Sequence, residues 1–232
     1  MMASHLNLNH LVFLLQGALW TVVLSFIACL GGGLLGFGVA LCRVAPVAWL
    51  RAVSGGYVTI VQGTPLMVLM FLLYFGLPSL GLDVPPLLAA SSALVVNVSA
   101  FLGEIWRGAI QSVPRPQWEA AECLALSRTQ RLFRVILPQA VRIATPPTVG
   151  FSVQIIKNTS LASVVGFVEL ARAGQIINNS LFEPFIVYLL IAGLYFCICY
   201  PVSRWSRALE RKAGAATQRE PLAAIPAGVF AP

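Results

Sequence analysis

Charged residues are scarce in this chain of 232 residues. Asp, Glu, Lys and Arg together make up 10% of it, whereas 58% of the residues are hydrophobic. A soluble globular domain is about one-quarter charged, so this chain has too few charges to cover a surface exposed to water. Together with a mean hydropathy of +0.85, this excludes an ordinary cytosolic domain, a disordered chain and a collagen-like fibre. The composition predicts an integral membrane protein.

Patterns for catalysis and metal binding are also missing. The sequence has no Gly-x-x-x-x-Gly-Lys-Ser/Thr loop to hold nucleotide phosphates and no Gly-x-Ser-x-Gly nucleophile turn. The two histidines, His5 and His10, stand in the N-terminal tail without partners at metal-ligand spacing. The five cysteines form no disulfide framework. We therefore expect no catalytic site, no metal site and no cofactor bound by this chain.

Long uncharged runs indicate where the chain crosses a bilayer. About 20 apolar residues are needed for a helix to span the hydrocarbon core. The runs predict an all-α membrane protein with five transmembrane helices, at about residues 11–41, 52–77, 85–106, 141–162 and 184–205. Outside these spans, we expect an N-terminal tail over residues 1–10 and a disordered C-terminal tail over residues 209–232.

The distribution of Lys and Arg predicts the orientation, because cytoplasmic loops are enriched in these residues. With the N-terminus outside and the C-terminus in the cytoplasm, 13 of the 15 Lys and Arg face the cytoplasm. Arg172 then lies outside and Lys157 lies within the membrane. The net charge of +7 and the pI of about 9.6 thus follow from topology. Since the basic residues are split over three loops, we expect no nucleic-acid partner.

Glycine and proline predict the local geometry of three spans. The pattern Gly32-x-x-x-Gly36 in the first span predicts a close contact with another helix. Pro65 follows Gly63 in the second span and predicts a kink there. Pro146 and Pro147 predict a bend in the fourth span.

Polar residues inside the spans are candidates for a transport route. Glu104 and Arg107 stand at i, i+3 and can pair, either as a structural ion pair near the inner interface or as part of a gate. Lys157 is followed by Asn158-Thr159-Ser160. Four such residues together favour a broken helix that lines a cavity. The alternative is a single Lys157 whose amine reaches the interface.

A polar segment over about residues 107–141 separates the third and fourth spans. Pro114–Ser127 is predicted to form a short helix, with Glu119 and Glu122 favoured by its positive N-terminal end. The stretch after it has arginines on one face and apolar residues on the other. Such an amphipathic stretch suits either anionic lipid or the groove of a protein partner, and its composition does not separate the two.

Several motifs occur in an order that identifies a family. The polar segment contains Gln117-Trp118-Glu119-Ala120-Ala121-Glu122, which resembles the EAA loop of binding-protein-dependent ABC importer permeases. More narrowly, the chain resembles polar amino acid permeases over about residues 15–208. The supporting stretches are Gly63-Thr64-Pro65-Leu66, Tyr74-Phe75-Gly76-Leu77-Pro78, Glu104-Ile105-Trp106-Arg107-Gly108, Lys157-Asn158-Thr159-Ser160-Leu161-Ala162-Ser163 and Glu169-Leu170-Ala171-Arg172-Ala173-Gly174-Gln175.

This resemblance implies a type-1 permease domain over residues 11–208 in a bacterial inner membrane, with a periplasmic N-terminus and a coupling-helix loop at about residues 114–140. It implies ATP-driven uptake of amino acids by a dimer of permease subunits, either two copies or two paralogues. The implied partners are ATPase subunits that bind ATP and Mg, a periplasmic substrate-binding protein and membrane lipid. The implied ATPase-coupling residues are Glu119, Ala120, Ala121, Ala125, Leu126 and Ser127. The candidates for the translocation pathway are Gln62, Thr64, Glu104, Lys157, Asn158, Thr159 and Ser160.

The chain departs from the family pattern at three positions. Ala125 stands where the family usually has glycine, from which we expect slightly altered docking rather than its loss. Gln62 replaces a frequent arginine and Asn158 a frequent aspartate, so charge is removed near the implied pathway. The alternative function is a channel or secondary carrier for small solutes that works without an ATPase. A membrane enzyme would need a catalytic cluster, and an assembly subunit would lack a polar route.

Overall fold

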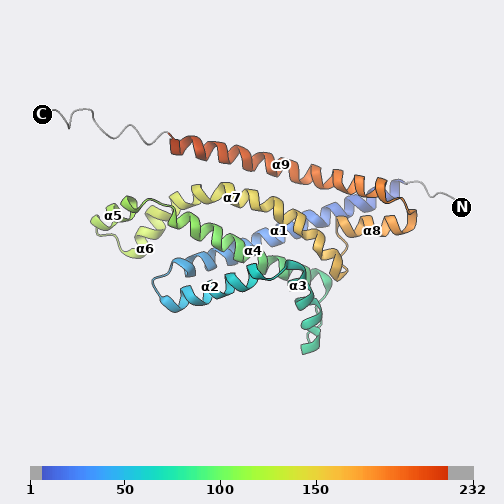
Figure 1. Cartoon of the computed structure of the whole chain (residues 1–232), viewed down its shortest axis with the longest axis horizontal. Coiled ribbons are helices and arrows are strands. Elements are labelled where there is room, and N and C mark those ends of the chain that lie inside the picture. The colour runs from blue at the N-terminus through green and yellow to red at the C-terminus, as the bar shows by residue number, and fades with distance from the viewer. Residues whose placement is uncertain (1–6, 219–232) are drawn as a thin grey trace.

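The computed structural model describes residues 7–218, and every regular element in this range is helical. Four long helices run along the length of the molecule (Figure 1): α1 (Leu8–Val44), α4 (Pro86–Gln111), α7 (Leu137–Asn158) and α9 (Pro184–Gln218). The shorter helices are α2 (Ala48–Gly63), α3 (Leu66–Phe71), α5 (Arg115–Cys123), α6 (Arg128–Gln130) and α8 (Leu170–Leu181). Figure 1 places α5 and α6 at one end of the bundle, and α8 with the start of α1 at the other. We call these the α5 end and the α8 end.

Four short segments of other helix types connect or extend these helices. The π-helical η1 (Leu72–Gly76) and the 3-10 helix η2 (Pro78–Leu80) continue α3. The π-helical η3 (Arg131–Ile136) joins α6 to α7, and the 3-10 helix η4 (Thr159–Val165) follows α7.

The surface of the bundle is apolar over much of its length. Leu34, Val53, Ile60 and Phe185 are each more than 60% exposed, which suits contact with lipid tails and not with water. Among the described residues, α1, α4 and the Pro184–Ala213 part of α9 are each long and apolar enough to cross a membrane. Two bent pairs of helical segments bring the number of candidate spans up to five.

The predicted close contact of the first span is confirmed, and its partner is α4, on which α1 packs most extensively. A Cβ on Gly32 would lie 2.4 Å from Cγ1 of Val98, and a Cβ on Gly36 would lie 3.0 Å from the carbonyl oxygen of Ser99. The two backbones approach so closely only because these positions lack side chains. The α1–α4 pair is the most extensive contact between two helices in the described part of the chain.

The second span is broken where Pro65 predicted a kink. Helix α2 ends at Gly63, Thr64 is extended, and α3 begins at Leu66. The segments on the two sides differ in direction by 102°, so a single continuous helix over residues 52–77 was wrong. Pro65 lacks an N–H donor and disfavours helical backbone in the residue before it. The arm formed by α3, η1 and η2 consequently projects from the bundle (Figure 1).

The fourth span begins earlier than predicted, at Leu137, and continues through Pro146 and Pro147 to Asn158. Helix α8 was not predicted at all. It carries Arg172 and several amide side chains, so it falls below the hydropathy of a spanning segment. Its signal was the acidic residue Glu169 just before its first turn, which is typical of a helix start.

The chain ends also differ from their predictions. Helix α1 begins at Leu8, within the predicted N-terminal tail. Helix α9 continues to Gln218, so the predicted disorder is wrong for residues 209–218. The helical backbone extends beyond the apolar part of α9, downstream of Pro201, whose missing N–H leaves one gap in the hydrogen-bond ladder. Residues 1–6 and 219–232 of the predicted tails lie outside the described residues.

Buried side chains form a core at each level of the bundle. The central cluster includes Leu24, Met70, Leu94, Val98 and Ile155. At the α8 end, α1, α8 and α9 contribute Leu14, Leu170, Ile177, Val187 and Ile191. At the α5 end, the cluster consists of Ile110 from α4, Val113 from the loop after it, Ile136 from η3, and Ala140 and Ala144 from α7. Each end of the bundle therefore has its own apolar core, next to the polar side chains at that end.

Candidate functional site

A tight turn connects α5 to α6, within the range Pro114–Ser127 that was predicted to be helical. Helix α5 ends at Cys123, and Ala125 has φ 54°, in the left-handed region. The amide of Ala125 donates to the carbonyl of Glu122 at 2.8 Å, and that of Leu126 donates to Ala121 at 3.3 Å. Ser127 begins α6: its hydroxyl accepts from the amide of Gln130, whose side chain accepts from the amide of Ser127. The predicted short helix is confirmed, but it ends at Cys123 and not at Ser127, because the left-handed Ala125 ends it.

We expect Ala125→Gly to stabilise this turn. A left-handed backbone costs an L-residue about 1–2 kcal/mol, and glycine adopts it freely, although its unfolded chain has more freedom. A net gain of about 1 kcal/mol would slow hydrogen exchange at the Leu126 amide roughly fivefold. The control is Ala120→Gly in the helical part of α5, which should speed exchange instead. Equal effects at the two positions would contradict the backbone explanation.

Three contacts hold α5 against η3 and the N-terminal part of α7. Trp118 packs into the cluster at the α5 end. Oε2 of Glu122 lies 2.9 Å from a guanidinium nitrogen of Arg131 in η3. The Gln139 amide donates to the side-chain oxygen of Gln117 at 3.4 Å. These contacts join α5 to η3 and to the first turns of α7.

The opposite face of α5 is free. Glu119, Ala120, Ala125 and Ser127 are exposed, and Leu126 is partly exposed. Ala121 is only 3% exposed and faces inward. Of the predicted coupling residues, Ala121 therefore supports the helix, and the others lie at or near its outer surface. Leu124, which was not predicted, is 74% exposed in the turn.

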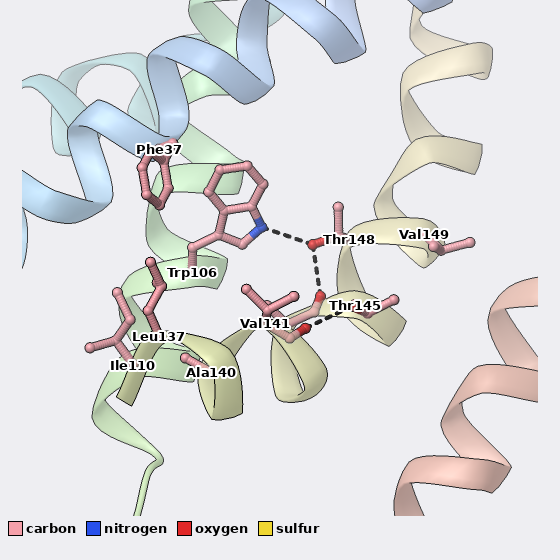
Figure 2. Close-up of a pocket in the computed structure, with 10 residues that line it drawn as sticks. Phe37, Trp106, Ile110, Leu137, Ala140, Val141, Thr145, Thr148 and Val149 are labelled. Atoms are coloured by element: carbon pink, nitrogen blue, oxygen red, sulfur yellow. Dashed lines mark hydrogen bonds between the residues drawn. The ribbon is translucent and has the colours of Figure 1, made fainter. Parts of the chain in front are cut away.

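A cavity of 230 Å³ lies between α1, α4 and α7, next to the cluster at the α5 end. Figure 2 shows the indole of Trp106 over this cavity, with Phe37 on one side and Val141 below. The indole N–H donates to the hydroxyl of Thr148 at 2.9 Å, and that hydroxyl donates to the carbonyl of Ala144 at 2.7 Å. The lining residue Val141 is 55% exposed, so this apolar cavity opens on one side to the surroundings of the bundle.

Glu104 is shared by two arginines. The predicted Glu104–Arg107 pair is confirmed, and Arg107 also contacts Gln111. Arg43 from α1, which was not predicted to take part, brings its Nε to 3.5 Å from the other carboxylate oxygen. The side chains of all three residues are about one-quarter exposed. One carboxylate thus joins α1 to α4 and leaves an excess of one positive charge.

The remaining pathway candidates occur at the break between α2 and α3 and at the junction where α7 continues into the 3-10 helix η4, and α3 packs against η4. At the break, the Gln62 amide donates to the carbonyl of Ala100 at 3.5 Å, and Thr64 donates to Ile60 at 2.8 Å. At the junction, Lys157 is exposed and Asn158 accepts from Gln154 at 3.0 Å.

The hydroxyls after Asn158 differ in exposure. Ser160 is half-buried and donates to the carbonyl of Lys157 at 2.7 Å. Thr159 is fully buried and donates to Ile156 at 2.8 Å. Thr159 therefore lies in the core, whereas Gln62, Lys157 and Asn158 have polar atoms at or near the surface.

Sequence reasoning missed the role of Glu169. This side chain is fully buried, and it accepts from the amides of Ala171 and Arg172 at 2.8 and 2.9 Å. The hydroxyls of Tyr195 and Thr21 lie 2.9 and 3.5 Å from the same carboxylate. One side chain therefore caps α8 and joins α1 to α9. Only its position before a helix marked it in the sequence.

A family model covers most of the chain. Residues 32–214 match the model of the binding-protein-dependent transport system inner membrane component. The chain belongs to this family. It is accordingly a multi-pass protein of the inner membrane and a transport permease subunit.

Relatives support this membership along nearly the whole permease. It is 34% identical to the probable amino-acid ABC transporter permease protein YckA of Bacillus subtilis (strain 168), over 90% of this chain and 92% of the relative. It is 36% identical to the L-cystine transport system permease protein TcyB of the same organism, over 84% of each chain. A chain from the crystal structure of an amino acid ABC transporter with histidines matches with a TM-score of 0.82 and 31% identity, over 90% of this permease and 99% of that chain. The MetNI methionine ABC transporter, at 20% identity and a TM-score of 0.72, shares the fold.

Proposed function

We propose that this permease forms the translocation pathway of an ATP-driven importer for amino acids and is driven through α5. The observation that carries the proposal is the arrangement of α5: it is anchored on one face to η3 and α7 and is free on the other. The names of the relatives support amino acids as the substrate class.

The proposed topology has five spans, with each bent pair counted as one. The N-terminus is periplasmic, and α5 and α6 lie in the cytoplasm. The support is the positive-inside rule, since 13 of the 15 Lys and Arg then lie on the cytoplasmic side. In this orientation the free face of α5 is presented to a cytoplasmic partner.

The proposed partner at α5 is an ATPase subunit, which binds ATP and Mg in its own chain. To shift a two-state equilibrium from 1:99 to 99:1 takes about 5.5 kcal/mol of differential binding. A helix seated in a groove of the ATPase can transmit such an energy, because Trp118 packs α5 into the cluster at the α5 end and the Glu122–Arg131 ion pair joins it to η3, which leads into α7. Helix α7 then moves relative to α4 beside the cavity under Trp106.

A second permease subunit and a periplasmic substrate-binding protein complete the proposed importer. The route for the substrate runs past the break between α2 and α3, where an interrupted helix exposes backbone polar groups, and past the junction of α7 with η4. Gln62, Thr64, Lys157, Asn158 and Ser160 are the side chains proposed to line it. Glu104 is instead proposed to hold α1 and α4 together at its inner end.

We expect Lys157→Ala to lower the rate of uptake about tenfold without loss of the assembled importer. Lys157 is exposed, so its removal leaves no buried group unpaired, and only a contact with the moving substrate or with water is lost. Uptake of labelled substrate into proteoliposomes measures the effect. Lys157→Arg, which keeps the positive charge, should retain most of the activity. Full uptake in Lys157→Ala would remove this residue from the pathway.

The function is tested by reconstitution. The permease is purified with its ATPase and placed in liposomes, and uptake of amino acids is measured with the binding protein present. We expect uptake to require ATP, the ATPase and the binding protein together. Uptake by the permease alone would favour the alternative, a channel or secondary carrier. Absence of a stable complex with any ATPase would overturn the proposal.

A further inference from the structure

A groove runs between α1 and α2, and α4 forms its floor. Its lining includes Leu35, Gly38 and Cys42 from α1, and Leu50, Val53 and Tyr57 from α2. Val53 is 66% exposed and Leu35 is 54% exposed, so the groove opens to the surroundings of the bundle. The α1 part of the lining covers about 10 Å at the helical rise of 1.5 Å per residue.

Two arginines stand at the end of this groove where α1 turns into α2. Arg43 follows the lining residue Cys42, and its Nη1 would lie 2.7 Å from a Cβ on Gly55, which is next to the lining residue Ser54. Arg51 follows the lining residue Leu50. One of its guanidinium nitrogens donates to the carbonyls of Ala45 and Pro46, at 2.8 Å each. Both cations are thus fixed beside an apolar groove.

The charge at this end is not balanced by the described part of the chain. Arg43 shares Glu104 with Arg107, and Arg51 has no carboxylate partner among residues 7–218. Trp49, beside Leu50, is 63% exposed, as is common for aromatic residues at a membrane interface. The site therefore combines an apolar groove, two fixed cations and an interfacial indole, which match the tail and the phosphate of a lipid.

We propose that this groove holds an acyl chain of an anionic phospholipid of the cytoplasmic leaflet, with its phosphate on Arg43 and Arg51. Guanidinium groups bind phosphate through paired hydrogen bonds, and each basic residue near an anionic membrane surface adds attraction. The placement in the cytoplasmic leaflet rests on the topology in the proposed function. A second permease subunit is the other possible occupant, but it would have to supply the missing negative charge, which a phosphate carries.

The test introduces bulky side chains that occupy the groove in place of the lipid. A Cβ on Gly38 would have no other atom within 4 Å, so Gly38→Phe places a ring in the groove without touching the backbone of a neighbour. Gly193 in α9 is equally open, and Gly193→Phe is the matched control on another face. Val53→Trp fills the groove from the α2 side, in case Gly38→Phe fails to assemble. All are purified as complete importers with their ATPase subunits.

The readout is the amount of phosphatidylglycerol and phosphatidylcholine that stays bound through a detergent wash, measured by native mass spectrometry after mixing with both lipids. The parent protein and Gly193→Phe should retain phosphatidylglycerol at least fivefold over phosphatidylcholine. Gly38→Phe and Val53→Trp should lose this retained lipid, and Arg51→Gln should lose the preference for phosphatidylglycerol.

Three results would overturn the proposal. They are equal retention of phosphatidylglycerol in Gly38→Phe and in the control, equal retention of the two lipids by the parent protein, and crosslinking of a cysteine at position 38 to a second permease subunit. Lipid retention needs no transport, and ATP-driven uptake is measured on the same preparations. A failure of the lipid site with normal uptake is thereby distinguished from a failure of the proposed transport function.

Discussion

Replacing Gly36 with leucine is expected to remove at least nine-tenths of the folded permease. A Cβ at this position would lie 3.0 Å from the Ser99 carbonyl and 3.2 Å from the Gly103 amide nitrogen. Both are backbone atoms, so the contact is relieved only if α1 and α4 move apart along their whole seam. Adding methylene groups to a packed core costs about 1–3 kcal/mol and occasionally more. Leucine adds far more than a single methylene group to this contact, so we expect a cost at or above the upper end. The yield of monodisperse protein in detergent measures the loss.

The matched control for this prediction is Gly38→Leu, two residues along the same helix. A Cβ there has open space within 4 Å, so leucine should fold at nearly the parent yield. If the two variants fold equally well, the α1–α4 seam is not the constraint that its geometry indicates. If both fail, loss of glycine flexibility and not close approach would be the cause.

Reversing the charge of Glu119 is expected to abolish uptake while leaving the permease intact. Glu119 is exposed on the free face of α5, and the described structure gives it no ion pair or side-chain hydrogen bond. Glu119→Lys should therefore insert and fold normally. The new positive charge would oppose the proposed ATPase contact, and we expect uptake to fall more than tenfold.

The measurement compares uptake with ATP hydrolysis in the same proteoliposomes. Glu119→Lys should lose substrate-stimulated hydrolysis along with uptake, or hydrolyse ATP without uptake. The control is Glu119→Gln, which keeps the shape of the side chain and should retain an intermediate activity. Normal uptake together with normal stimulation in Glu119→Lys would show that this face of α5 is not the coupling surface.

Sequence reasoning succeeded where a local pattern determines the structure. A run of apolar residues is sufficient to predict a helix in a membrane, and the absence of a side chain at Gly32 and Gly36 is sufficient to predict a close contact. Pro65 likewise predicted its break, because the missing donor acts within its own turn. The effect of Pro65 is local, whereas the glycine pattern predicted a close contact without identifying its partner, α4.

The sequence was insufficient where distant elements decide the outcome. Arg43 pairs with Glu104 across 61 positions of the chain, and no pattern near either residue indicates the other. Glu169 meets Thr21 and Tyr195 only after three helices have packed. The burial of Thr159 has the same origin, since its polar neighbours in sequence indicated a lined cavity. In the α5–α6 turn, Ala125 stands where the family usually has glycine, but its left-handed backbone conformation was visible only in the structure.

The four donors around the Glu169 carboxylate bear on how this permease is able to move. They tie α1, α8 and α9 together at one end of the bundle, whereas α5 at the opposite end is anchored on one face only. An end whose helices are joined through one buried carboxylate resists separation more than an end that has a free face. We therefore expect spin labels placed near α5 to change their separation during turnover by several times more than labels placed near α8.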